Sequence, residues 1–494
     1  MNPILPDFRT AAFEKGAPID NPYFPVTPGT IRSYSGSKEE GGEIETESND
    51  LFVTFETKKI KGVETTVVRD TAYHDGVLVE DTLDWYAQDA DGNVWYLGEI
   101  AYNYRYGDEG DYTSTDTDGS WTAGKGGAKP GWIMPAQPEV GDSYYQEFAR
   151  GIAEDEGRVE AVDEEVTIAL DTYNDVLKTL DTTALEPTAR EFKYYAPGVG
   201  QVLAEEGLNA QNEADFVVEL QGTRQVVKDD DDDDAEDDDD DDDDNDADDA
   251  DDEAGEGDHE FDLSDLSDGQ PLAGADQADG PDADDFEGEG ADKYVTVLGG
   301  TTDLDDALGA YTFDLHSGRI REGMILYASS EEIEAGDSFA LKVRDGKGLG
   351  LFAVADGGEL GVDLSTYEDG GLFFRNILTG RKATIDDGLA PLVLDSDGTP
   401  LPIQPLHVVG NDDGFNFLNP VAGVHAVELE SEALGEEDDV VLLGFEDRRV
   451  TDPDWDGDYN DLIVAVSEEP LSADLVESLL AELQSGPVAD ALIA

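Results

Sequence analysis

The chain has 494 residues, with 120 Asp and Glu against 29 Lys and Arg, and its formal net charge at pH 7 is -91. A surface this negative repels phosphate backbones and anionic lipid head groups, so we expect cations as partners, and neither nucleic acid nor membrane insertion. The absence of cysteine excludes disulfides, thiolate metal sites and cysteine nucleophiles.

Residues 1–20 are expected to form an N-terminal tail, and residues 21–227 an antiparallel β domain of unknown ligand. Short runs rich in β-branched and aromatic residues are typical of strands, and they occur at Leu51–Thr57, Thr65–Arg69 and Glu165–Leu170. The regular recurrence of such runs predicts a mainly antiparallel, barrel-like sheet.

A hairpin is expected within this domain. The runs Asp84–Tyr86 and Val94–Tyr96 flank a short loop in which Gly92 and Asn93 tolerate positive φ. The surrounding aromatic residues fit cross-strand core pairs, and the alternative is a stacking platform for sugars. These residues are Trp85, Trp95, Trp121, Trp132, Tyr86, Tyr96, Tyr102 and Tyr104.

Residues 228–292 are predicted to be a disordered acidic linker. The segment opens with an almost unbroken aspartate run, Asp229–Asp252, and contains no Lys or Arg between Lys228 and Lys293. Charge repulsion and the scarcity of large apolar residues keep such a segment unfolded. The parts on either side are therefore expected to fold independently, with the aspartate run acting as a spacer that also attracts divalent ions weakly.

Residues 293–469 repeat the strand pattern of the N-terminal part. Gly and Asp turns separate the runs Tyr311–Leu315, Gly323–Tyr327, Phe339–Val343 and Val440–Gly444. We predict a β-sandwich for this segment. The overall expectation is a mainly β protein, with a barrel-like domain and a β-sandwich joined by the acidic linker.

Residues 470–494 are expected to form a helical tail. Five leucines at helical spacing predict one apolar face, and Ser472 or Asp474 can cap the helix. The tail is a candidate uncleaved export signal, because residues 1–18 lack the basic and then apolar pattern of a secretory signal. The leucines are Leu471, Leu475, Leu479, Leu480 and Leu483.

The strongest motif is a loop dense in oxygen donors, Asp452-Pro453-Asp454-Trp455-Asp456-Gly457-Asp458-Tyr459-Asn460-Asp461. Its first six residues fit the D-x-D-x-D-G opening of an EF-hand calcium loop. The twelfth position is Ile463, which cannot coordinate, and the flanking runs have the pattern of strands. The sequence therefore predicts a calcium loop of EF-hand type on a β scaffold.

Hard oxygen donors without His or Cys favour Ca²⁺ over Zn²⁺ or Cu²⁺, and the number of carboxylates suits the coordination of calcium better than that of magnesium. The predicted ligands are oxygen atoms, with the carbonyl assigned at Asp458 and a bracing role left open for Asn460. They are Asp452, Asp454, Asp456, Asp458, Asn460 and Asp461, with Glu446 and Asp447 as secondary candidates.

The alternative is an acidic turn in an acidic protein. Packing these carboxylates together costs several kcal/mol unless a cation neutralises them, and composition alone does not explain a glycine at the turning position. Adaptation to high salt would explain acidic surfaces, but it would not explain the regular spacing of the loop.

The segment Leu443-Gly444-Phe445-Glu446-Asp447, followed by Asp454–Val464, resembles the G-F-E-D and D-x-D-[FY]-N-D signature of the bacterial domain of unknown function 4114. Asn416–His425 is similar to the L-N-P and His segment of that family. The resemblance implies a C-terminal, calcium-binding β domain of a secreted or surface protein with an adhesin-like architecture. Asn21–Thr30 and Lys193–Val202 resemble uncharacterised extracytoplasmic bacterial β domains.

These observations predict a non-enzymatic, calcium-binding protein at the cell surface or outside the cell, exported by a type I route. A glycan or a surface protein is the expected ligand. Calcium would neutralise the loop and tie two strands together, with an affinity of roughly 10⁻⁴ to 10⁻³ M, as in extracellular modules. The alternative is a glycan-active hydrolase with two carboxylates in the N-terminal domain.

Overall fold

A computed structural model of the chain describes residues 3–40, 42–107, 110–227, 261–262, 266, 272, 286–288, 290, 292–300, 305–330, 333–357, 360–409, 411–412, 415–431, 433–434, 439–452 and 455–483. The aspartate run predicted to be disordered lies outside the described residues. So do residues 484–494 of the predicted helical tail.

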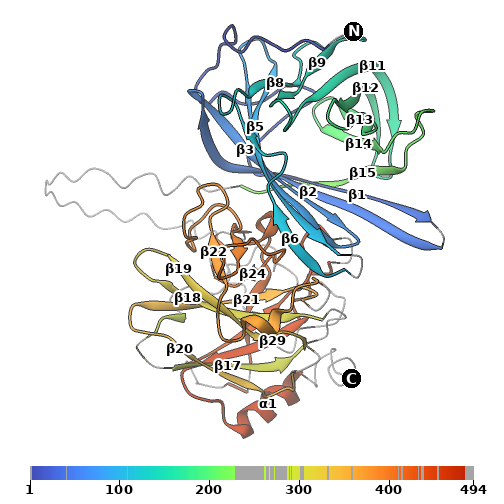
Figure 1. Ribbon diagram of the computed structural model, residues 1–494. Helices are drawn as coiled ribbons and strands as arrows, with labels where there is room; N and C mark the ends of the chain where they lie inside the picture. The colour runs from blue at the N-terminus through green and yellow to red at the C-terminus, as the bar shows by residue number, and fades with distance from the viewer. Residues whose placement is uncertain are drawn as a thin grey trace, which may run out of the picture.

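The first 227 residues form one antiparallel sheet of 15 strands, seen in the upper half of Figure 1. The strands are β1 (Thr30–Glu40), β2 (Glu43–Ile60), β3 (Val63–His74), β4 (Val77–Gln88), β5 (Val94–Tyr106), β6 (Tyr112–Asp116), β7 (Trp121–Thr122), β8 (Lys129–Met134), β9 (Ser143–Tyr145), β10 (Glu147–Phe148), β11 (Asp155–Thr167), β12 (Thr172–Thr183), β13 (Arg190–Ala196), β14 (Gly200–Glu206) and β15 (Phe216–Gln225).

The order of these strands explains the barrel-like shape. It runs β10-β8-β5-β4-β3-β2-β1-β15-β14-β13-β12-β11-β9, with β6 and β7 added to β5. The two ends of this order, β10 and β9, are separated along the chain by Gln146 alone. The sheet must therefore curl until its ends lie close together, which confirms the predicted barrel-like antiparallel domain.

The predicted hairpin is confirmed, because β4 and β5 pair with Tyr86 opposite Tyr96. The Asp89 carboxylate accepts hydrogen bonds from the loop amides of Asp91 and Asn93, each at 3.0 Å, and thereby closes the turn. The run predicted as a strand at 165–170 is shorter than expected: β11 ends at Thr167, and the remaining residues turn into β12.

The aromatic residues of this domain lie mostly inside it. Trp85 and Trp95 are each 2% exposed, and the Tyr86 and Tyr96 rings stack with centroids 4.9 Å apart. Trp121 packs edge-on against Tyr96 at 5.5 Å. The residues therefore form core pairs across strands rather than an exposed platform for sugars.

The C-terminal part contains two main sheets. Its strands are β16 (Phe261–Asp262), β17 (Asp292–Gly299), β18 (Ala307–Asp314), β19 (Ile320–Tyr327), β20 (Ser338–Lys342), β21 (Lys347–Val354), β22 (Phe373–Arg375), β23 (Leu392–Leu394), β24 (Leu406–His407), β25 (Asn411–Asp412), β26 (Phe415–Asn416), β27 (Ala426–Glu430), β28 (Val440–Phe445) and β29 (Leu462–Ser467), with 3₁₀ turns η6 (Leu364–Tyr367) and η7 (Pro420–Ala422).

One sheet has the order β16-β27-β28-β29-β17-β20, and the other has the order β19-β18-β21-β24. Residues of both sheets share one apolar core, with Leu443 and Val464 from the first and Tyr311 and Phe352 from the second. Two sheets that bury a common core form a sandwich, as predicted.

The predicted C-terminal helix is also confirmed, as α1 (Ala473–Leu483). The Leu475 amide donates a hydrogen bond to the Ser472 hydroxyl at 3.2 Å, so Ser472 rather than Asp474 caps the helix. Leu479 and Leu483 pack on the outer face of the six-stranded sheet. No helix among the described residues is long and apolar enough to span a bilayer.

Some residues of the predicted linker belong to the C-terminal core. Leu266 and Phe286 are 0% and 1% exposed, and Phe261 pairs in parallel with β27 beside Leu429. Leu266 and Phe286 bury apolar surface, which the acidic composition of the segment did not predict.

The N-terminal and C-terminal parts touch along a seam. Tyr73 donates a hydrogen bond to Gln404 at 2.7 Å, and Arg69 donates one to the Ala390 carbonyl at 3.1 Å. Leu389 and Leu392 join the apolar cluster of the N-terminal sheet. Independent folding of the two parts stays a prediction, and the seam is a contact that the sequence did not predict.

Candidate metal centre

Strand pairing brings together two acidic segments that are 14 residues apart in sequence. In the antiparallel pair β28 and β29, Phe445 lies opposite Leu462. Glu446 and Asp447 follow the first strand, and Asp461 precedes the second. The acidic side chains therefore meet at one end of the six-stranded sheet.

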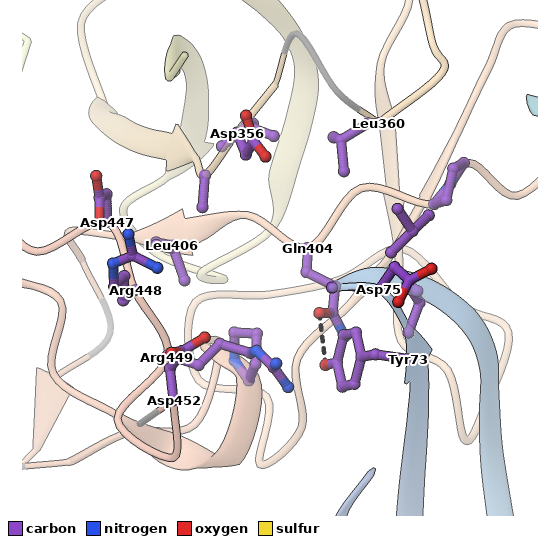
Figure 2. A pocket seen from close by; sticks show the side chains of 17 residues that line it. Tyr73, Asp75, Asp356, Leu360, Gln404, Leu406, Asp447, Arg448, Arg449 and Asp452 are labelled. Atoms are coloured by element: carbon purple, nitrogen blue, oxygen red, sulfur yellow. Dashed lines mark hydrogen bonds between the residues drawn. The ribbon is translucent and has the colours of Figure 1, made fainter. Parts of the chain in front are cut away.

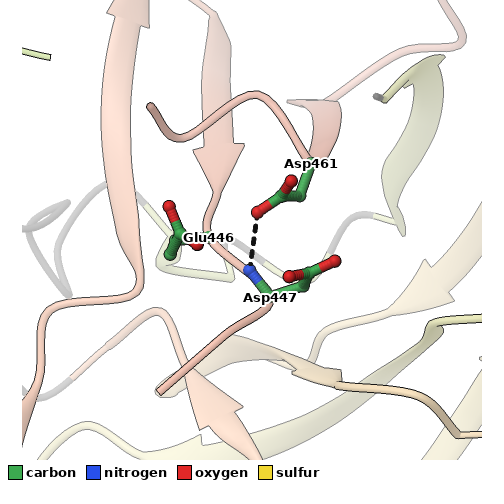
Figure 3. A group of neighbouring side chains, drawn as sticks. All are labelled: Glu446, Asp447 and Asp461. Carbon is green, nitrogen blue, oxygen red and sulfur yellow. Dashed lines mark hydrogen bonds between the residues drawn. The ribbon is translucent and has the colours of Figure 1, made fainter. Parts of the chain in front are cut away.

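Two groups of three carboxylates converge here. The ligand atoms of Glu446, Asp447 and Asp461 lie within 4.8 Å of one another, and so do those of Glu446, Asp456 and Asp458. Figure 3 shows the first group, in which the Asp447 amide donates a hydrogen bond to the Asp461 carboxylate at 2.9 Å. Glu446 belongs to both groups, so they form one acidic centre.

The loop before β29 is shaped by two residues with positive φ. Gly457 has a φ of 66°, and a Cβ atom there would lie 2.9 Å from the Trp455 ring. Tyr459 has a φ of 54°, is 1% exposed, and anchors the loop by donating a hydrogen bond to the Val424 carbonyl at 3.2 Å. These turns present the Asp456 and Asp458 carboxylates to Glu446.

The carboxylates of this centre repel one another strongly. Two like charges 4.8 Å apart cost about 3.5 kcal/mol at an effective dielectric constant of about 20. Burial, followed by the charges of Asp461 and Asp456, raises the pKa of Glu446. Burial and the neighbouring Asp447 likewise raise the pKa of Asp461. A divalent cation would turn this repulsion into attraction.

Glu446 provides a second observation that points to a ligand. Its side chain is 1% exposed, and its Oε2 atom has no hydrogen-bond partner among the described residues. A buried carboxylate oxygen without a partner is costly, because it has lost water and gained nothing in exchange. The arrangement is therefore suited to a cation that binds this oxygen.

Asp306 is a buried neighbour of Asp447 that the sequence did not predict. It immediately precedes β18, is 2% exposed, and accepts a hydrogen bond from the Asp356 amide at 3.0 Å. Burial and the adjacent Asp447 raise its pKa well above the usual range. Asp306 stands 140 residues before Glu446 in an acidic chain, so nothing in the local sequence singles it out.

The structure places some of the predicted ligands in the two carboxylate groups and others outside them. Asp456 and Asp461 each lie in one of the two groups, and Asp458 contributes its side chain to the second, whereas the prediction used its carbonyl. Asn460 is fully buried beside them, and its backbone N–H donates a hydrogen bond to the Asp458 carboxylate at 3.1 Å. Asp454 lies outside the described residues.

Asp452 belongs to neither group and lies at the seam. It lines a cavity of about 260 Å³ between the two parts, together with Tyr73, Gln404, Asp447 and Arg449 (Figure 2). A role for Asp452 as a ligand stays a prediction. Glu446 and Asp447, expected only as secondary candidates, are instead central, because strand pairing rather than loop spacing positions them.

The donor set fits calcium. All the side chains of the centre present oxygen, and His425, which is buried beside it, has its Nδ1 atom 3.3 Å from the Glu446 carbonyl rather than in the carboxylate groups. Such a set suits a hard cation with six to eight oxygen ligands. Glu446, Asp447, Asp456, Asp458 and Asp461 would hold it, with Asp306 close by.

The N-terminal domain contains a separate group of buried carboxyls. The Tyr96 hydroxyl lies 2.5 Å from Asp84 and 2.8 Å from Glu99. A hydroxyl carries one proton, so one of the two carboxyls must also hold a proton. The pair is enclosed by the aromatic core, and the hydrolase alternative stays a prediction.

Comparisons with known proteins add little information about the function of the chain. No family model matches the chain, and no curated protein matches it. A candidate exported protein with a YmcC-like fold from Bacteroides fragilis is 13% identical, covering 41% of this chain and 99% of that one, with a TM-score of 0.23. A candidate lipoprotein from Parabacteroides distasonis is 12% identical, covering 41% and 98%, with a TM-score of 0.22. Likenesses this weak carry no functional argument.

Proposed function

We propose that the protein is a non-enzymatic calcium-binding protein whose C-terminal sandwich is stabilised by Ca²⁺. The observation that carries the proposal is the convergence of two carboxylate groups on the buried, unpartnered oxygen of Glu446. Calcium bound there ties the end of β28 to the loop before β29, so binding and folding of the sandwich are coupled.

The resemblance to the domain of unknown function 4114 supports this proposal. The G-F-E-D run of the signature supplies Glu446 and Asp447, and the second run supplies Asp456, Asp458 and Asp461. The two runs are separate in sequence, yet their acidic residues share one centre. A common cation is a simple reason for both runs to be acidic.

A location at the cell surface or outside the cell belongs to the same proposal. Extracellular calcium modules bind with dissociation constants of about 10⁻⁴ to 10⁻³ M, which suits millimolar calcium but not the low free calcium of a cytosol. The sandwich would gain its full stability only after export. The N-terminal domain would then present a glycan or protein ligand site in an adhesin-like arrangement.

The test is calorimetric titration of the full chain with Ca²⁺, together with thermal unfolding in calcium and in chelator. We expect saturable uptake and a higher melting temperature for the C-terminal transition. Asp456→Asn combined with Asp461→Asn should abolish both, whereas Glu430→Gln, an exposed position on β27, should leave both unchanged. Equal uptake in the double variant and the parent would reject the assigned centre.

A further inference from the structure

The loop that joins the two acidic segments also reaches across the seam. Asp447 belongs to the metal centre, and Arg449 and Thr451 follow it on the same loop. The Arg449 guanidinium lies 2.7 Å from the Asp50 carboxylate, and the Thr451 hydroxyl donates to the same carboxylate at 2.9 Å. Asp50 is on β2, in the N-terminal sheet.

These contacts are largely shielded from solvent, with the Arg449 side chain 18% exposed. Asp50 is 4% exposed, and the Arg449 guanidinium covers the Tyr73 ring at 3.6 Å from its centroid. Figure 2 shows Arg449 beside Tyr73, with Asp447 and Asp452 along the same loop. A buried ion pair that is also stacked on an aromatic ring tolerates little displacement, because a lost partner leaves a charge without compensation.

The geometry makes the position of Arg449 depend on the metal centre. Only Arg448 separates Arg449 from Asp447, whose amide is bonded to the Asp461 carboxylate. Without a cation, the repulsion among the carboxylates would weaken the contact of this end of the loop with Asp461. With a cation, the same end is held in the place from which Arg449 and Thr451 reach Asp50.

We infer that calcium at the metal centre and docking of the loop on the N-terminal sheet stabilise each other. The inference rests on the proposed function and adds a partner to it: the calcium loop binds the chain's own N-terminal domain. Coupling between two sites is reciprocal. Calcium therefore strengthens docking, and a weakened seam lowers the affinity for calcium by the same factor.

The first test measures calcium affinity by calorimetry in the full chain carrying Asp50→Asn. Loss of the charge that faces Arg449 should weaken calcium binding by about fivefold or more, within the usual range of coupling between sites. Asp215→Asn is the matched control, because it removes the same charge from an exposed side chain of the N-terminal domain, 67% accessible. Equal affinities in the two variants would overturn the inference.

The second test needs no substitution, so it holds even where Asp50→Asn fails to fold. Hydrogen exchange of the parent chain is followed by mass spectrometry in calcium and in chelator. Chelation should speed exchange in peptides that cover Asp50 and Tyr73, and leave β13, which makes none of these contacts, unchanged. Faster exchange confined to the C-terminal part would overturn the coupling. Absence of calcium uptake by the parent would instead overturn the proposed function.

Discussion

Replacing Glu446 by Gln distinguishes a metal ligand from an ordinary acidic residue, because its effect on stability should depend on calcium. Glu446 has four acidic neighbours within 4.8 Å, namely Asp447, Asp456, Asp458 and Asp461. A single pair at this distance costs about 3.5 kcal/mol at an effective dielectric constant of about 20. In chelator, Glu446→Gln should therefore stabilise the C-terminal domain by about 2 to 4 kcal/mol.

In calcium the stabilising effect of the same substitution should shrink. The amide offers one neutral oxygen where the carboxylate offers a charged one, so binding weakens and its stabilising contribution falls. For the parent, a free calcium concentration 100 times the dissociation constant contributes about 2.7 kcal/mol. Calcium at that concentration should therefore stabilise the parent more than the variant, so the gap between their unfolding curves should narrow relative to chelator.

The assay is denaturant unfolding followed by tryptophan fluorescence, to which Trp455 in the loop contributes a local signal. Both proteins are measured in chelator and in a series of calcium concentrations. A Glu446→Gln variant that is less stable than the parent in both conditions would show that the side chain supports packing alone. That result would refute the reasoning from repulsion.

Two further predictions concern the barrel and the loop. Burial raises the pKa of Glu99 from 4.5 to about 7, so between these pH values the folded barrel retains a proton at Glu99 that the unfolded chain loses. Glu99 alone should lower barrel stability by about 1.4 kcal/mol per pH unit in this range, in addition to the other buried carboxyls. Glu99→Gln should reduce the measured slope by about that amount in urea unfolding across the range. Gly457→Ala puts a side chain at φ 66° against the Trp455 ring, so it should lower the stability of the folded domain by on the order of 1 to 2 kcal/mol. It should also weaken calcium binding about tenfold in calorimetry. Unchanged binding would contradict the assigned loop geometry.

The local features of the fold were predictable because each depends on neighbouring residues. The hairpin of β4 and β5 follows from Gly92 and Asn93 between two aromatic runs, and α1 follows from leucines at helical spacing after Ser472. The acidic loop was recognisable because its donors alternate around Gly457. In each case the pattern lies within about a dozen residues.

The features that escaped prediction depend on distant pairing. Glu446 is central because β28 and β29 pair so that Phe445 faces Leu462, and no loop spacing encodes that register. Asp306 approaches Asp447 from the start of another strand, in a chain where one more aspartate carries no information. Arg449 and Asp50 are 399 residues apart, so their ion pair was invisible to a reading of motifs.

The repulsion among the carboxylates of the loop also affects the contact between the two parts of the chain. Arg449 is one of 29 basic residues facing 120 acidic ones, so the chain has few cations with which to join its two parts. One of them lies two residues from Asp447, where the repulsion among the carboxylates acts on its position. A bound calcium ion would neutralise that repulsion and leave Arg449 free to pair with Asp50. In an exported chain, calcium would therefore stabilise both the sandwich and its contact with the N-terminal domain. Without calcium, the contact between the two parts would be weaker.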